Sequence, residues 1–194
     1  MRINPVLAMI GALTVCLVTL HQSAKAQTPH ALTANEKQIA ATFEQRAKAY
    51  TKMREQLEEQ MPKLSKEAKP EEIETHKKQF QERVRAARTG AKQGEVFTPE
   101  AATFIRAIIK DEFKGKDRIE LRDTVLRESE NKAVPLRVNY PYPESQELLE
   151  MPATLLIRLP QLPKQLRYRF VRSNLLLVDR ENGLIVDYMT KAPP

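Results

Sequence analysis

The pattern of apolar residues changes once along this chain, near residue 133, and this change limits the fold to a helical part followed by strands. Before it, apolar residues recur every three or four positions, as on one face of an amphipathic helix. After it, β-branched and aromatic residues alternate with polar ones, and eight of the 13 prolines lie in residues 135–194. We therefore predict an α+β fold, in which about four amphipathic helices in residues 27–132 precede a small antiparallel β-meander in residues 133–194, packed together as one domain.

Capping residues and prolines predict where the helices begin. Thr33 and Glu36 have the spacing of a capping box, and the helix that follows runs for roughly seven turns towards Pro62. Pro70 and Thr98 mark the next two starts, since proline suits a first helical position and threonine suits an N-cap. The expected buried faces of these two helices are Ile73, Phe80, Val84 and Ala87, then Phe104, Ile105, Ile108, Ile109 and Phe113, and a shorter fourth helix is expected over 117–126.

Three short strands are predicted near the C-terminus, over 166–172, 175–179 and 184–188. The connection at 180–183 ends in Asn-Gly, which supplies the positive φ of a tight hairpin turn. Residues 136–140 read as a further strand that extends the meander, and 154–159 as a single helical turn. In the first strand, alternation predicts one core face and one face in water: Leu166, Tyr168 and Phe170 on the first, Arg167 and Arg169 on the second.

Residues 1–26 have the pattern of a secretory signal peptide. Arg2 precedes an uncharged apolar run at 6–20, and Ala24 and Ala26 form an A-x-A cleavage site. A membrane-spanning helix is the alternative, but it needs about 20 apolar residues, more than this run provides. We expect an exported protein, periplasmic or secreted, that begins at Gln27 and has no membrane span.

Removal of the signal peptide changes the chemistry that the chain can perform. It lowers the formal net charge from +7 to +5 and removes Cys16, the one cysteine. A lipid anchor on Cys16 is not expected, because Val15 stands where a bacterial lipobox has a small residue. The mature chain is therefore predicted to have no disulfide, no thiol catalysis and no cysteine-ligated metal.

The strand region resembles known exported proteins in the runs 166–171, 175–179 and 183–187. These runs are similar to a C-terminal hairpin of small exported bacterial proteins, among them periplasmic proteins associated with nickel and cobalt efflux. The longer stretch from 94–100 through 141–143 to 159–163 resembles an uncharacterised secreted family. The resemblance implies the fold and the compartment, whereas the His-rich stretches of the metal-linked group are absent here, so none of its functional residues is carried over.

Few residues of the mature chain suit catalysis or metal binding. His30 and His76 are its only histidines, and Glu72 with His76 offers two metal ligands where a zinc site wants three or four. We expect His76 half-buried on a helix flank. Asp179 and Asp187 are the only acids within the strand pattern, and we expect them at turns or facing solvent. The sequence therefore predicts no catalytic residue, no metal site and no cofactor.

A basic patch is the main candidate for binding. The interval between Glu150 and Asp179 contains no acid, and its cations suit an anionic partner such as lipid headgroups, an acidic polysaccharide or an acidic protein surface. A solvated sheet face that discourages edge pairing is the alternative. Export argues against nucleic acid. The predicted anion-binding residues are Arg158, Lys164, Arg167, Arg169 and Arg172.

Taken together, these features predict a non-enzymatic protein with an interaction or envelope-maintenance role. Two other functions stay open, a metal-stress-associated periplasmic protein and a hydrolase that uses carboxylates. The first helix, with charges of both signs around a narrow apolar stripe, either binds a protein partner or a second copy, or packs on the other helices.

Overall fold

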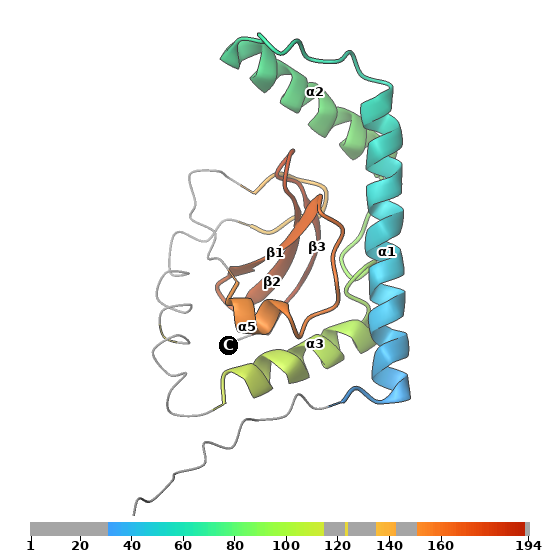
Figure 1. Ribbon diagram of the computed structural model, residues 1–194, viewed down its shortest axis with the longest axis vertical. Helices are drawn as coiled ribbons and strands as arrows, with labels where there is room; N and C mark the ends of the chain where they lie inside the picture. The colour runs from blue at the N-terminus through green and yellow to red at the C-terminus, as the bar shows by residue number, and fades with distance from the viewer. Residues whose placement is uncertain (1–30, 115–122, 124–134, 143–150, 193–194) are drawn as a thin grey trace, which may run out of the picture. The chain divides into compact units, whose positions relative to one another are not determined.

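The structure is a computed structural model that describes residues 31–114, 123, 135–142 and 151–192. The elements below all belong to one compact unit that begins at Leu32. The predicted α+β fold is confirmed: helices precede a three-stranded antiparallel sheet. In Figure 1 the elements are α1 (Ala34–Glu59), α2 (Pro70–Ala87), α3 (Pro99–Glu112), α5 (Ala153–Leu156), β1 (Leu166–Val171), β2 (Asn174–Asp179) and β3 (Ile185–Met189).

The helices begin where the capping signals predict. The Thr33 hydroxyl accepts from the Glu36 N–H at 3.2 Å, and the Glu36 carboxylate accepts from the Thr33 N–H at 2.8 Å, which completes a capping box. The Thr98 hydroxyl caps α3 by accepting from the Ala101 N–H. The predicted fourth helix lies outside the described residues except for Asp123, and the predicted helical turn near 154 is α5.

The sheet is the predicted meander, with β2 between β1 and β3. Gly183, in the connection between β2 and β3, has a φ of 70° and confirms the left-handed position expected of the Asn-Gly pair. A β-bulge between Leu177 and Val178 shifts the register with β3. The turn between β1 and β2 consists of Arg172 and Ser173, one residue earlier than predicted.

The strand predicted over 136–140 is wrong. Asn139 has a φ of 66°, which interrupts an extended backbone, and the segment meets the sheet at a single bridge between Pro141 and Leu184. Asn139 N–H also donates to the carbonyl oxygen of Ile185 at 2.7 Å. Proline has no N–H for a strand ladder, and asparagine tolerates the left-handed region, so this sequence forms a turn beside β3.

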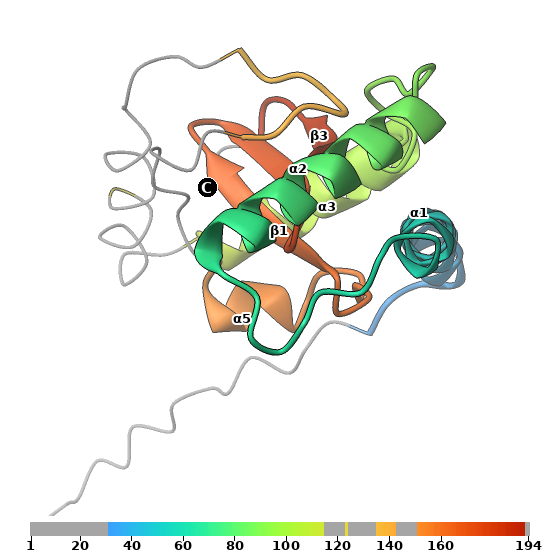
Figure 2. The ribbon, with the colours of Figure 1, turned by 90° about the horizontal axis from the view of Figure 1, so that it is seen from above.

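Helices and strands share one hydrophobic core. Phe43 of α1, Phe80 of α2, Ile105 of α3 and Phe170 of β1 are each at most 1% exposed and belong to the same cluster. Helix α1 packs against both α2 and α3, and Figure 2 shows it nearly end-on beside the sheet. Ordinary packing therefore accounts for the apolar stripe of α1. On α2, the predicted face is buried at Phe80 and Val84, but Ile73 and Ala87 are exposed.

The second face of the sheet is not open to water as the sequence predicted. A second apolar cluster forms there from Tyr142, Leu176, Val178 and Ile185, with Leu136 and Tyr188 packed against it. Arg167 and Arg169 lie on this face and are half-buried. The run Leu175–Val178 has no polar residue, a pattern typical of a strand that is covered on both sides.

Candidate anion-binding groove

Arg158, the first residue of the predicted basic patch, forms ion pairs with two acids. Its guanidinium lies 2.6 Å from Asp111 Oδ2 and 3.0 Å from Glu112 Oε2, at the end of α3. The hydrogen bond from Arg158 lowers the pKa of Asp111. These two acids compensate part of the Arg158 charge, and anion binding by Arg158 stays a prediction.

The other four predicted residues lie within β1 or next to its ends. Lys164 is exposed just before the strand, and Arg172 is exposed in the turn after it, with a φ of 54°. Arg167 and Arg169 share the second face of the sheet, as alternation predicted, but they are half-buried. Anion binding by these four residues stays a prediction.

Asp179 lies where β2 meets the following turn, which is one of the two predicted alternatives, but it is fully buried, so the solvent-facing alternative is wrong. Its Oδ2 accepts from the Tyr50 hydroxyl at 2.8 Å and lies 3.0 Å from Arg54 Nε, while Oδ1 accepts from the N–H groups of Glu181 and Asn182. Burial, followed by the nearby Asp179, raises the pKa of Tyr50 well above its usual value. The carboxylate thus joins α1 to the connection between β2 and β3.

Asp187 is also fully buried, contrary to the prediction. Its carboxylate accepts four backbone hydrogen bonds of 2.7 to 2.9 Å. Burial raises the pKa of Asp187, and these four N–H groups oppose the shift. The four donors are the N–H groups of Gly94, Val96, Phe97 and Tyr188. Asp187 therefore organises the loop before α3, a structural task.

His76 is half-buried on the flank of α2, as predicted, with Nε2 3.1 Å from the carbonyl oxygen of Pro62. It borders a hollow of about 470 Å³ that Glu55, Glu58 and Glu181 also line. Two of these acids, Glu58 and Glu181, pair with Arg54. Within the described ranges, no group of three or more His, Cys, Asp or Glu side chains is placed to hold a metal ion.

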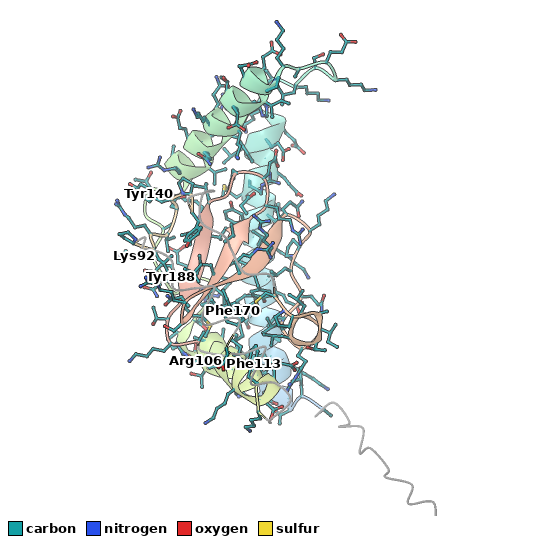
Figure 3. All side chains as sticks on the ribbon, turned by 90° about the vertical axis from the view of Figure 1, so that its left-hand side faces the viewer. Lys92, Arg106, Phe113, Tyr140, Phe170 and Tyr188 are labelled. Atoms are coloured by element: carbon teal, nitrogen blue, oxygen red, sulfur yellow. The ribbon has the colours of Figure 1, made fainter. Side chains whose placement is uncertain are left out.

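A larger open groove, of about 750 Å³, lies beside the C-terminal end of α2. One wall is the end of α2 and the loop through Gln93, and the other is the segment 136–140. Tyr188 of β3 lies between them, and Figure 3 shows it on the same side of the molecule as Lys92 and Tyr140. We call this the α2 groove.

The α2 groove is strongly basic. Four cations line it, Arg85, Arg88, Lys92 and Arg137, and Glu82 is the one acid among the described lining residues. A concave surface lined by charges of one sign concentrates their field and attracts counter-ions. An anion is therefore the ligand that this surface favours.

The Tyr140 ring forms cation–π contacts with two of these cations. The guanidinium carbon of Arg85 lies 4.3 Å from the centre of the Tyr140 ring, and that of Arg137 lies 4.0 Å from it. Each such contact contributes about 0.5–1 kcal/mol at an exposed site. The two arginines come from segments about fifty residues apart in sequence, and both contact one ring in the lining of the groove.

Arg88 also lines the groove. Its Nη2 donates to the carbonyl oxygen of Val186 at 3.0 Å and lies 3.5 Å from Glu95 Oε2. Its Nη1 is buried and has no hydrogen-bond partner within the described chain. A buried donor without a partner is uncommon in folded proteins and marks a place where water or a ligand can supply the acceptor.

Asn139 joins the two walls of the groove. Its Nδ2 donates to the carbonyl oxygens of Arg85 at 2.9 Å and Arg88 at 3.2 Å, at the end of α2, where these oxygens also accept from the backbone N–H groups of Arg88 and Ala91. Its own Oδ1 is buried without a partner in the described part of the chain. The left-handed backbone of Asn139 thus fixes Tyr140 beside the end of the helix.

The α2 groove could not be predicted from the sequence, because its two walls are distant in the chain. The local signal was the spacing of Arg137 and Tyr140 before two prolines, which the sequence analysis assigned to a strand. Nothing in the sequence pattern shows that the end of α2 lies against this segment.

Comparison with protein-family models, curated protein sequences and solved structures finds no match to this chain. The resemblance of residues 166–187 to a hairpin of exported metal-efflux proteins stays a prediction. Helices of the described residues are all too short or too polar to span a membrane.

Proposed function

We propose that this protein is exported, is not an enzyme, and binds an anionic component of the cell envelope in the α2 groove. The observation that carries the proposal is the pair Arg85 and Arg137 on Tyr140. Neither arginine forms an ion pair with an acid among the described residues, and Arg137 is exposed while Arg85 is half-buried.

Two cations on one ring repel each other unless an anion lies near them. Because both guanidinium carbons are within 4.3 Å of the same ring centre, they are at most twice that distance apart. A phosphate or carboxylate group accepts hydrogen bonds from guanidinium forks. Binding an anion therefore relieves the repulsion that the folded protein keeps at this site.

The lining of the groove supports binding in preference to hydrolysis. A hydrolase that uses carboxylates needs two of them across a cleft, and the described lining has Glu82 alone. The same lining has no histidine, serine or cysteine to act as base or nucleophile.

The test is a binding assay on protein purified from the exported fraction, with polygalacturonate and phosphatidylglycerol vesicles as anionic probes at low salt. The double variant Arg85→Gln/Arg137→Gln should bind at least about ten-fold more weakly, as expected when two charge-assisted contacts are lost. Its matched control, Lys78→Gln/Arg83→Gln, removes the same charge from exposed positions of α2 outside the groove and should bind like wild type.

A second double variant distinguishes binding in the α2 groove from binding at the basic patch predicted from the sequence. Arg167→Gln/Arg169→Gln removes two cations of β1, neither of which lines the α2 groove. If only this variant loses binding, the groove assignment is wrong and the site is on β1. If no variant binds less well than the control, the anion-binding proposal fails.

A further inference from the structure

The α2 groove has a second cationic point, Lys92, besides the pair Arg85 and Arg137 on the Tyr140 ring. Lys92 is exposed on the loop after α2, and its ammonium group forms no ion pair with an acid of the described chain. The nearby Glu95 carboxylate is already engaged, because it accepts from the Lys92 backbone N–H at 2.9 Å and approaches Arg88 Nη2. The Lys92 side chain is therefore available to a ligand.

The two cationic points differ in chemistry. Arg85 and Arg137 present planar forks on a common ring, and such forks suit the oxygens of a phosphate or carboxylate group. Lys92 offers a flexible, compact charge that accepts an anion from many directions. A ligand that satisfies both has at least two anionic groups.

The size of the groove also exceeds the needs of a single small anion. Its volume of about 750 Å³ lies within the range of about 300–1,000 Å³ found for sites that hold whole organic ligands. The lining also includes Tyr188 and Gln93, which suit a ligand body that is neither purely charged nor purely apolar. The groove is open to solvent, so a ligand held in it can extend beyond it.

We propose that the ligand of the α2 groove is a linear polyanion with phosphate or carboxylate groups repeated along it, one group held by Arg85 and Arg137 and a second by Lys92. This rests on the proposed function and specifies its ligand class. An isolated anion such as inorganic phosphate uses only the first of these contacts, and so binds more weakly.

The experiment compares monomeric and polymeric anions of the same chemistry on protein from the exported fraction. The pairs are inorganic phosphate with polyphosphate and galacturonate with polygalacturonate, titrated calorimetrically at equal concentrations of anionic groups and at several salt concentrations. We expect each polymer to bind at least about ten-fold more tightly than its monomer, because additional charged contacts act within one molecule.

The variant Lys92→Gln isolates the second contact. It should weaken polymer binding by about three- to ten-fold, lower the slope of log affinity against log salt by about one, and leave monomer binding unchanged. Arg85→Gln/Arg137→Gln should weaken both. Lys78→Gln, an exposed position of α2 outside the groove, is the single-charge control.

The outcomes separate this inference from the proposed function. If monomer and polymer bind equally and the arginine variant weakens both, the groove binds an anion but the polyanion inference is wrong. If Lys92→Gln has no effect on polymer binding, it is also wrong. Binding to phosphatidylglycerol vesicles without binding to either soluble polymer would assign the ligand to a lipid surface. Absence of all anion binding at low salt would overturn both proposals.

Discussion

The hydroxyl of Tyr50 on α1 donates a 2.8 Å hydrogen bond to Oδ2 of Asp179, the last residue of β2 and 129 positions further along the chain. Arg54, one turn later on α1, lies 3.0 Å from the same carboxylate oxygen and also contacts Glu181. The buried pair of Arg54 and Asp179 thus links α1 to the sheet. Removing either partner would leave the other charge buried and unpaired, which is strongly destabilising.

Replacement of Asp179 by alanine should lower the free energy of unfolding by about 3–5 kcal/mol, because it leaves the buried Arg54 without its main partner. The Arg54 side chain is only 3% exposed. Urea melts measure the loss. The control is Glu58→Gln, which removes a partner of Arg54 that is 42% exposed and should cost no more than about 1 kcal/mol. Equal losses in the two variants would mean that the buried contact is not the dominant one.

Asp187→Asn should destabilise the protein by about 2–4 kcal/mol, although it changes only one atom of the side chain. The amide group would turn two hydrogens towards N–H donors where the carboxylate now accepts four bonds. Hydrogen exchange should show faster exchange at the N–H groups of Val96 and Phe97. The control is Asp111→Asn, at a side chain that is 53% exposed, which should lower the free energy of unfolding by less than about 1 kcal/mol. Unchanged exchange in the Asp187 variant would contradict the assignment.

Phe170→Ala should cost about 3–5 kcal/mol, because the ring is 1% exposed within the main core between sheet and helices (Figure 3). Arg169→Ala should cost no more than about 1 kcal/mol, since Arg169 lies on the opposite face and is half-buried. Denaturant melts of the two single variants give the comparison. If Arg169→Ala cost more than Phe170→Ala, the assignment of β1 residues to the two faces of the sheet would be off by one residue.

Stability should fall as the pH rises above about 10, the pKa of an unfolded tyrosine. Burial raises the pKa of Tyr50 and of Tyr168 well above that value in the folded protein. The folded state therefore retains protons that the unfolded state releases, so the contribution of these residues is complete below pH 10 and is lost above it.

Urea melts between pH 9 and 11 test this dependence. Tyr168→Phe removes one of the two phenols, and it also removes a hydrogen bond to the carbonyl oxygen of Pro160, worth about 1 kcal/mol. The variant should therefore be less stable at pH 8 but lose less stability between pH 10 and 11 than wild type. Parallel curves over that interval would show that Tyr168 ionises without unfolding.

Exported protein should begin at Gln27, because Ala24 and Ala26 fit the small-residue positions of a signal-peptidase site. Intact-mass spectrometry of material recovered from outside the cytoplasm measures this directly. A mass that includes residues 1–26, or a lipid attached to Cys16, would contradict the prediction and place the protein at the membrane.

Local sequence signals predicted most of the elements. The capping box at Thr33, the Pro70 start and the Thr98 cap act within a few residues of each helix N-terminus, and the structure confirms all three. Alternation likewise assigned the buried residues of β1, because a side chain that points to the core must recur every second position. These features depend on neighbours in the chain, so the sequence alone determined them.

Long-range packing decided the features that the sequence left open or assigned wrongly. Asp179 and Asp187 were expected at turns or facing solvent. Both are buried, because distant partners, Tyr50 and Arg54 for one and the 94–97 loop for the other, satisfy their charges. The α2 groove has the same origin: Arg85 and Arg137 become neighbours only when Asn139 caps the end of α2. Tertiary structure made these choices because hydrogen bonds and charge pairs act over a few ångströms of space, whatever the separation in sequence.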